Sequence, residues 1–250
     1  MGRLNNKVII VTGAGSGMGA ATTAMFVDEG AHVIACDMNE SGLKQWEGNP
    51  NIISLQVDLT QKAAIDKISE VVKHQCDGKL HGLCNIAGIN DLGYPLLETD
   101  DERWDRVIDV DLKAPFRLIR AIVPILIENG GGSIVNVGSY AALRGNHGPS
   151  YTAAKTGLTG LTKSVAFGHA KDNIRCNIIQ PGGTATNIGE TSGGAYHEAQ
   201  QVLSNILMAT PVRFYNEPKE IAYLCTFLCS DESTWINGAE ISIDGGMAVC

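Results

Sequence analysis

Three side chains in the second half of this 250-residue sequence have types that can move a proton to or from an oxygen atom. Tyr151 and Lys155 are four residues apart in a predicted helix over 150–171, so both project from one face of it. A free phenol has a pKa of about 10, too high for a base at neutral pH, and a nearby ammonium lowers it. Ser139 follows a predicted buried strand over 133–138, where its hydroxyl can hold a ligand oxygen. These residues predict a tyrosine that acts as an acid or base.

A glycine-rich turn, TGAGSGMG, follows a predicted apolar strand over 7–12. Gly13 permits a tight turn, Gly17 lets backbone N–H groups approach a pyrophosphate, and Gly19 allows the next helix to pack close to the sheet. That helix, predicted over 17–29, offers free N–H groups and partial positive charge at its N-terminus. The pattern predicts a dinucleotide-binding turn.

Asp37 ends the next predicted strand, 31–37, twenty-four residues after Gly13. A carboxylate at this place can accept a hydrogen bond from an adenosine ribose 2′-hydroxyl, and it would repel the 2′-phosphate of NADP. Ser16 and Met38 occupy the neighbouring places where an Arg or Lys could read that phosphate. The sequence therefore predicts NAD as the cofactor.

Short apolar strands alternate with helical patterns, which is typical of a parallel sheet covered by helices on both faces. The other predicted strands are 52–57, 80–86, 174–180 and 240–243, and the other predicted helices are 40–46, 61–75, 101–129, 196–208 and 217–230. We find no repeat, linker or low-complexity tract in the sequence. The pattern therefore predicts a single α/β domain over 1–250 with a doubly wound, Rossmann-like sheet of seven strands. The long segment 183–210 contains no strand and is interpreted as a substrate lid.

The composition excludes several classes of partner. A net charge of −8 argues against nucleic acid or an anionic membrane, and no apolar stretch reaches the ~20 residues of a membrane span. Seven scattered cysteines without a C-x-x-C pair favour reduced thiols and a cytoplasmic protein. Cys225 and Cys229 are four residues apart without a nearby histidine, so we interpret them as core residues and expect no metal site.

With the stretches SIVNVGSYAALRGNHGPSYTAAKTG and NIIQPGGTAT, the sequence resembles the short-chain dehydrogenase/reductase family over nearly its whole length. TGAGSGMG is similar to the family's T-G-x-x-x-G-x-G, NIAG to its N-N-A-G, YTAAK to its Tyr-x-x-x-Lys, and PGGTAT to its P-G-x-x-x-T. The resemblance implies seven parallel strands in the order 3-2-1-4-5-6-7, with the active site at their carboxyl ends.

The resemblance also implies roles for individual residues. Tyr151 exchanges a proton with the substrate oxygen as hydride moves to or from a nicotinamide, Ser139 holds that oxygen, and Lys155 lowers the Tyr151 pKa and binds the nicotinamide ribose. The implied cofactor-binding residues are Gly13, Ser16, Gly17, Met18, Gly19, Asp37, Asp58, Leu59, Asn85, Ala87, Gly88, Tyr151, Lys155, Pro181, Gly182, Thr184 and Thr186.

Asp111, in DVDLKAPF, departs from the family pattern. The family has an Asn here, whose backbone carbonyl helps to hold a water in a proton relay to the lysine. The carbonyl survives the change, but a carboxylate could pair with Lys155 and weaken its pull on Tyr151. We therefore include Asp111 in the catalytic set and expect an active enzyme whose pH optimum is shifted upward.

The resulting expectation is an NAD-dependent oxidoreductase that interconverts a secondary alcohol and its ketone. Apolar residues in 196–208 favour a substrate such as a hydroxysteroid or cyclic alcohol, and a sugar or polyol remains an alternative. A second alternative is a 3-oxoacyl-carrier-protein reductase; such enzymes usually use NADPH and receive an acidic partner, so Asp37 and the net charge of −8 count against it. A dinucleotide-sensing scaffold without turnover is a third, disfavoured by the intact serine, tyrosine and lysine. His147 is interpreted as a solvated loop histidine.

The family commonly forms tetramers through the two long helices that correspond here to 101–129 and 150–171. The stretch APFRLIRAIVPILI in the first of them is apolar on more than one face, consistent with a buried partner surface. We therefore expect a homotetramer that acts on a small molecule.

Overall fold

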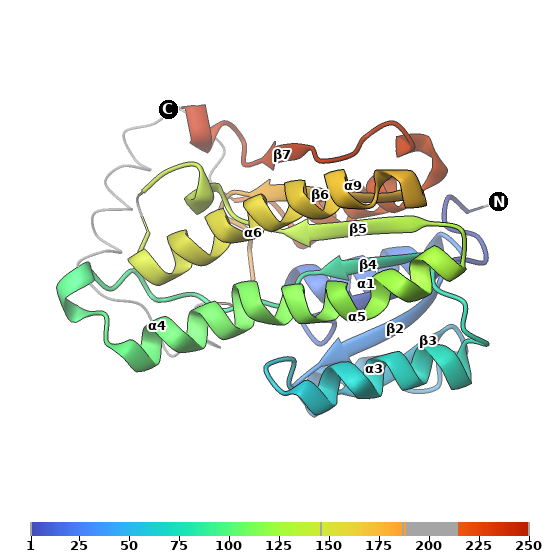
Figure 1. Ribbon diagram of the computed structural model, residues 1–250. Helices are drawn as coiled ribbons and strands as arrows, with labels where there is room; N and C mark the ends of the chain where they lie inside the picture. The colour runs from blue at the N-terminus through green and yellow to red at the C-terminus, as the bar shows by residue number, and fades with distance from the viewer. Residues whose placement is uncertain (1, 146, 187, 189–214, 250) are drawn as a thin grey trace.

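Seven parallel strands form one sheet in the order β3-β2-β1-β4-β5-β6-β7 (Figure 1). The computed structural model describes residues 2–145, 147–186, 188 and 215–249. The strands are β1 (Val8–Thr12), β2 (His32–Asp37), β3 (Ile52–Gln56), β4 (Gly82–Asn85), β5 (Gly132–Val137), β6 (Ile174–Pro181) and β7 (Glu240–Ile243). The predicted Rossmann-like sheet and strand order are confirmed.

Helices cover both faces of the sheet. Helices α3 (Lys62–Gln75), α5 (Ala114–Glu128) and α6 (Pro149–Gly168) lie on one face, and α1 (Gly17–Asp28) and α9 (Pro218–Cys229) pack together on the other (Figure 1). The short helix α2 (Glu40–Leu43) follows β2. A second short helix, α4 (Asp101–Ile108), lies between β4 and α5 in the sequence. The predicted helix over 196–208 and most of the predicted lid over 183–210 lie outside the described residues.

Each central strand is buried on both sides, which explains the continuous apolar runs in the sequence. Ile10 and Ile34 face the core formed with α3 and α5, whereas Val11 and Val33 face the core formed with α1 and α9. Cys225 and Cys229 belong to this second core, as interpreted from the sequence, and the Cys229 sulfur lies 3.6 Å from that of Cys84. Within the described residues, no helix is both long and apolar enough to cross a bilayer.

The prediction of one continuous helix over 101–129 is wrong. A π-helical turn over Asp109–Lys113 separates α4 from α5, and the Ala114 N–H donates to the Asp109 carbonyl, five residues back. Pro115, at the start of α5, has no N–H and so cannot make the α-helical bond to the Asp111 carbonyl. The break places Asp111 in the π turn, with its side chain fully buried.

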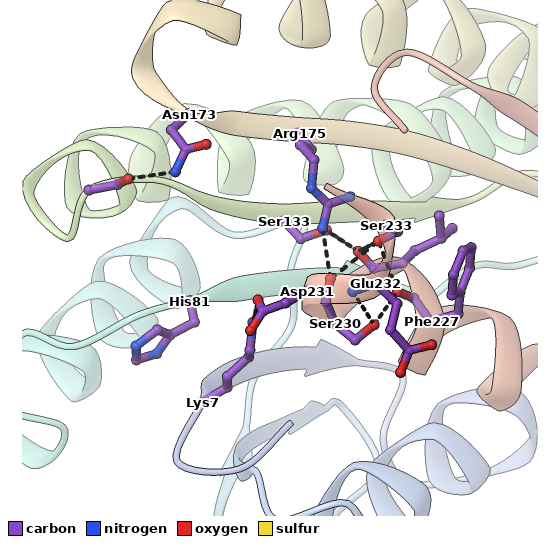
Figure 2. Close-up of polar contacts among 12 residues, drawn as sticks. Lys7, His81, Ser133, Asn173, Arg175, Phe227, Ser230, Asp231, Glu232 and Ser233 are labelled. Atoms are coloured by element: carbon purple, nitrogen blue, oxygen red, sulfur yellow. Dashed lines mark hydrogen bonds and ion pairs between the residues drawn. The ribbon is translucent and has the colours of Figure 1, made fainter. Parts of the chain in front are cut away.

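The amino ends of the central strands are fastened to the C-terminal end of α9 by side chains (Figure 2). Arg175 on β6 donates to the carbonyl oxygens of Leu228 at 2.7 Å and Ile236 at 3.3 Å. Ser133 on β5 donates to the same Leu228 oxygen at 2.7 Å, and Ser233 donates to it at 3.1 Å. The Leu228 carbonyl is one that the C-terminus of α9 leaves unpaired, and the Arg175 guanidinium lies at the negative end of the helix dipole.

Replacement of Arg175 by Ala removes charge-assisted hydrogen bonds at this end, and we expect the free energy of unfolding to fall by about 2 kcal/mol. Urea denaturation followed by circular dichroism measures the change. Lys219→Ala, which removes an exposed cation at the first turn of the same helix, is the control and should leave the midpoint unchanged. An equal change in the free energy of unfolding for the two variants would contradict the capping role of Arg175.

Candidate active site

The structure brings Ser139, Tyr151 and Lys155 together at the carboxyl ends of the central strands. Tyr151 and Lys155 lie on the first two turns of α6, both buried, and the Lys155 Nζ is 5.5 Å from the centre of the Tyr151 ring. Ser139 follows β5, and its side chain is close enough to that of Tyr151 to lower the pKa of the phenol. The i, i+4 spacing predicted that Tyr151 and Lys155 share one face of the helix, and the catalytic roles of the three residues stay predictions.

Gln180 on β6 holds Ser139 in place, a role that sequence reasoning missed. Its Oε1 accepts a 2.6 Å hydrogen bond from the Ser139 N–H, and its Nε2 donates to Thr159 and Glu240. Gly138 makes room for it, because a Cβ there would lie 2.1 Å from the Gln180 Oε1. A polar residue directly after Ile178 and Ile179 in a predicted buried strand was the signal that could have identified Gln180.

Lys155 is held between Asp111 and the end of β5. Its Nζ lies 3.2 Å from the Asp111 Oδ2 and donates to the Val137 carbonyl at 3.2 Å. The Asp111 Oδ1 accepts from the Ile89 N–H at 2.9 Å, while Oδ2 has no hydrogen-bond partner of good geometry among the described residues. The predicted pairing of Asp111 with Lys155 is therefore present in the structure.

These neighbours change the proton affinity of each group in a definite direction. Burial raises the pKa of Asp111, and Lys155 only partly opposes that effect. Burial lowers the pKa of Lys155, but the Asp111 carboxylate, with a smaller contribution from the Tyr151 oxygen, outweighs it and leaves that pKa raised. Burial likewise raises the pKa of Tyr151; Lys155 lowers it, and Asp111 raises it again. Without a further cation, Tyr151 is thus held as a neutral phenol at neutral pH.

A groove leads from the end of β2 to Tyr151 and has the shape of a dinucleotide site. The part nearer β2 is lined by Gly13, Ser16, Gly17, Met18, Gly19, Asp37, Ile86, Ala87, Gly88, Thr186 and Ile188. The part nearer Tyr151 shares Met18, Thr186 and Ile188 with it and adds Ser139, Pro181, Gly182 and Thr184. Most of the implied cofactor-binding residues thus lie along one continuous surface.

The glycines of the turn fit a closely approaching ligand. Gly13 and Gly17 have φ angles of +70° and +51°, and a Cβ on Gly17 would lie 3.0 Å from Thr186 across the groove. A Cβ on Gly19 would lie 2.0 Å from the Gly13 carbonyl oxygen, so α1 can approach the turn only with glycine here. The residues present therefore fit a nicotinamide dinucleotide, with the pyrophosphate at the N-terminus of α1.

Asp37 stands at the end of this groove, where an adenosine ribose would lie. Its Oδ2 accepts from the Gly15 N–H and its Oδ1 from the Asn39 N–H, both at 2.8 Å. Gln45 and Trp46, which sequence reasoning missed, donate to the carbonyls of Gly15 and Ala14 at 2.9 Å each. The glycine turn is therefore braced from the β2 side before any ligand binds.

Lys155 is buried and is not part of the groove lining, and three further implied cofactor residues do not line the groove either. The Asn85 side chain donates to the Asn136 Oδ1 at 2.8 Å and so links β4 to β5. Asp58 accepts hydrogen bonds from Thr60, and Leu59 packs against the core beneath α3 and α5. Their side chains shape the sheet edge, so their contact with a cofactor stays a prediction.

His147 lies in a loop, as interpreted, but it is half-buried against Tyr140 and Tyr151 rather than fully solvated. Its ring lies edge-on to Tyr140 with centroids 5.0 Å apart and 5.8 Å from the Tyr151 ring, and burial lowers its pKa. Together with Tyr215 and Met247, which sequence reasoning missed, these residues line the cleft in front of the Tyr151 side chain. The lining of this cleft is largely aromatic and apolar, with a few polar groups.

Comparison with known proteins agrees with this geometry. A family model described as Enoyl-(Acyl carrier protein) reductase matches residues 13–248. The chain is 37% identical to the short chain dehydrogenase adrF of Penicillium roqueforti, with all of both chains aligned. It is 38% identical to the 3-oxoacyl-acyl-carrier-protein reductase FabG of Thermotoga maritima, over 99% of this chain and 100% of the other. The crystal structure of levodione reductase superposes with a TM-score of 0.88 at 27% identity, over 99% of each chain.

The fold and the groove define a Rossmann-type dinucleotide-binding protein. More specifically, the chain belongs to the short-chain dehydrogenase/reductase family of oxidoreductases, whose members generally use nicotinamide dinucleotide cofactors.

The negative charge of Asp111 generates a prediction about pH dependence. This charge disfavours phenolate and raises the pKa of Tyr151, so Asp111→Asn should lower that pKa. Alcohol oxidation needs the phenolate as base, and we therefore expect the acid limb of the kcat/KM profile to move to lower pH in the variant. The profile is measured by following reduced nicotinamide across pH. A profile that coincides with that of the wild type would contradict the effect.

Proposed function

We propose that the protein is an NAD-dependent oxidoreductase that interconverts a secondary alcohol and its ketone. The observation that carries this proposal is the placement of Ser139 and Tyr151 at one end of the groove that has Asp37 at its other end, with the Lys155 Nζ 5.5 Å from the centre of the Tyr151 ring. The dinucleotide supplies the hydride acceptor or donor when it is bound, and the chain supplies the proton and the orientation.

The described contacts define what each residue does in this proposal. The Ser139 hydroxyl holds the substrate oxygen beside the Tyr151 hydroxyl, with Gln180 fixing the Ser139 backbone. Tyr151 accepts the hydroxyl proton in alcohol oxidation, or donates a proton in ketone reduction. Lys155 stabilises the phenolate and is the residue that would hold the nicotinamide ribose. Asp111 keeps Lys155 charged and in place, at the cost of part of its effect on Tyr151.

The preference for NAD rests on Asp37. Its carboxylate can accept from ribose hydroxyls, and a 2′-phosphate at the same place would face a negative charge. Like charges in close contact cost several kcal/mol, which corresponds to more than tenfold in affinity.

The substrate class follows from the pocket in front of Tyr151. Tyr140, His147, Tyr215 and Met247 form a surface of rings and a thioether that suits an apolar, ring-containing alcohol or ketone. The structural likeness to levodione reductase, which by its name reduces a dione, supports a ketone substrate. A hydroxysteroid or cyclic alcohol remains our proposal, and the pocket offers less to a sugar or polyol.

A 3-oxoacyl-carrier-protein reductase is the second candidate, favoured by the 38% identity to FabG and by the description of the family model. Asp37 and the net charge of −8 count against an NADPH-linked reaction with an acidic carrier protein. A scaffold without turnover is the third candidate, and the preorganised Ser139 and Lys155 speak against it.

The test is reduced-nicotinamide absorbance with NAD or NADP across secondary alcohols that include steroids, cyclic alcohols and polyols. We expect turnover with NAD, and a loss of about 10²–10⁴-fold in kcat for Tyr151→Phe with NAD affinity retained. Tyr223→Phe, an exposed tyrosine on α9, is the matched control and should behave as wild type. Turnover with NADP alone would refute the role of Asp37, and turnover of 3-oxoacyl thioesters alone would establish the second candidate.

We also propose that the chain forms a homotetramer. Phe167 on α6 and Trp235 after α9 are 90% and 98% exposed, and Phe116 and Ile127 on α5 are partly exposed. Large apolar side chains on several faces of a monomer are typical of subunit contacts.

Light scattering after size exclusion should give four times the chain mass of 26.5 kDa. Phe116 lies on α5, one of the two long helices that we expect to form the subunit contact. Phe116→Asp should therefore lower the measured mass without loss of helix content in circular dichroism. A wild-type mass equal to that of a single chain would rule out the tetramer.

A further inference from the structure

Asp91 is a fully buried carboxylate in the loop after β4, and the mechanism above makes no use of it. Its Oδ2 accepts from the Ser150 hydroxyl at 3.0 Å and from the Tyr151 backbone N–H at 2.9 Å. Its Oδ1 accepts from the Gly93 N–H at 3.1 Å. All three partners are donors, which is the bonding pattern of an ionised carboxylate.

Helix α6 lacks an N-terminal cap of its own. Its N-cap residue is Gly148, which has no side chain, its first residue is Pro149, and its first turn contains no acidic residue. The N–H groups at a helix start have no partner within the helix, and a side-chain oxygen normally accepts from one of them. Asp91 supplies that oxygen from sixty residues away in the sequence, and it does so at the N–H of Tyr151 itself.

The surroundings are shaped to admit this carboxylate. A Cβ on Gly148 would lie 2.3 Å from the Asp91 Oδ2, so glycine is required where the loop enters α6. Leu92, next to Asp91, has a φ of +66°, a left-handed conformation that is costly for leucine. The turn is held by the bond from Leu92 N–H to the Asn90 Oδ1 and the bond from Gly93 N–H to Asp91.

The same loop is tied to the other buried carboxylate of the site. The Ile89 N–H donates to the Asp111 Oδ1 at 2.9 Å, and two residues later Asp91 accepts from the start of α6. The stretch 89–91 therefore connects the π turn, which positions Lys155, with the helix turn that carries Tyr151.

We propose that Asp91 is a positioning residue, which fixes the first turn of α6 so that the Tyr151 hydroxyl meets Ser139 and the substrate oxygen. This assignment rests on the proposed acid/base role of Tyr151. It goes beyond that role by naming the group that sets the position of the tyrosine.

The charge of Asp91 has a second consequence for Tyr151. The groups facing the phenol are Lys155, Asp111, Asp91 and the ring of His147. Burial is the main cause of the raised pKa of Tyr151; Lys155 opposes it, and the charges of Asp111 and Asp91 add to it. Removing the charge of Asp91 while keeping its size therefore lowers the pKa of Tyr151.

Two variants of Asp91 separate its positioning of the first turn of α6 from its effect on the pKa of Tyr151. Variants of Asp100 provide the matched control. Asp100 caps α4, with its Oδ1 accepting from the Arg103 N–H at 2.7 Å, and it is not part of the catalytic set. Asp91→Ala should reduce kcat about 10–100-fold with little change in KM, because small displacements of a reacting group have effects of this size. Asp91→Asn should retain more activity and shift the acid limb of kcat/KM to lower pH. Asp100→Ala and Asp100→Asn should change neither kcat nor the acid limb of the kcat/KM profile.

A measurement without turnover distinguishes failure of this proposal from failure of the proposed function. Ultraviolet difference titration of wild type against Tyr151→Phe isolates the ionisation of Tyr151, and the pair is repeated in the Asp91→Asn background. A lower pKa of Tyr151 in that background supports the proposal, even if every alcohol tested is inert.

Two results together would overturn the proposal: an unchanged pKa of Tyr151 in the titration, and a folded Asp91→Ala variant whose kcat and pH profile equal those of wild type. Asp91 would then be a helix cap without influence on Tyr151. If Asp91→Ala does not fold, Asp91→Asn and Ser150→Ala decide by the same criteria. Ser150→Ala removes one of the two bonds to the Asp91 Oδ2 and should lower kcat less than the loss of both.

Discussion

The position of β1 between β2 and β4 is the constraint on which the site depends. From β1 the chain builds outward to β2 and β3, and it then returns to β4 on the other side of β1. The loops after β1 and β4 therefore diverge and leave a groove at the carboxyl ends of the strands. The glycine turn, the loop 86–93 and Ser139 all enter this groove because they follow parallel strands of one sheet. The contacts of Arg175 and Ser133 with α9 lie at the opposite, amino ends, so the fold is fastened away from the site.

Within the groove, the burial of one ammonium organises the chemistry. A buried charge is tolerated only with close partners, and Lys155 has the Asp111 carboxylate and the Val137 carbonyl. Asp91 adds a second buried carboxylate, which accepts from the Tyr151 backbone N–H. Burial raises the pKa of Tyr151 most, and the two carboxylates add to that effect while Lys155 opposes it, so the phenol is neutral in the ligand-free protein. A cationic ligand beside Tyr151, such as an oxidised nicotinamide ring, would restore the balance and favour the phenolate that alcohol oxidation requires.

Much of this could be predicted from sequence, because the informative signals are local. The glycine spacing, the strand-terminal Asp37 and the i, i+4 pair of Tyr151 and Lys155 each follow from the geometry of one turn or one helix, and the apolar runs gave all seven strands. The missed residues act across long sequence separations. Gln180 meets Ser139 from β6, Asp91 meets Tyr151 from the loop after β4, and Met247 reaches the cleft from beyond β7. The contacts of these side chains form only when the sheet order brings those loops together, so no local sequence pattern indicates them. His147 was misjudged for the same reason, since its burial depends on Tyr140 and Tyr151.

The break between α4 and α5 shows how a local signal can be present and still be overlooked. Helical periodicity continues through 101–129, yet Pro115 withholds the N–H that an α-helix would offer to the Asp111 carbonyl, and the chain widens into a π turn there. The turn fixes the backbone at residue 111 independently of its side chain. Because Asp and Asn have nearly the same shape, an aspartate here leaves that backbone geometry intact and adds a charge beside Lys155. The departure from the family pattern is therefore electrostatic in nature: the charge of Asp111 raises the pKa of Tyr151 directly, and its pairing with Lys155 weakens the opposing effect of the ammonium.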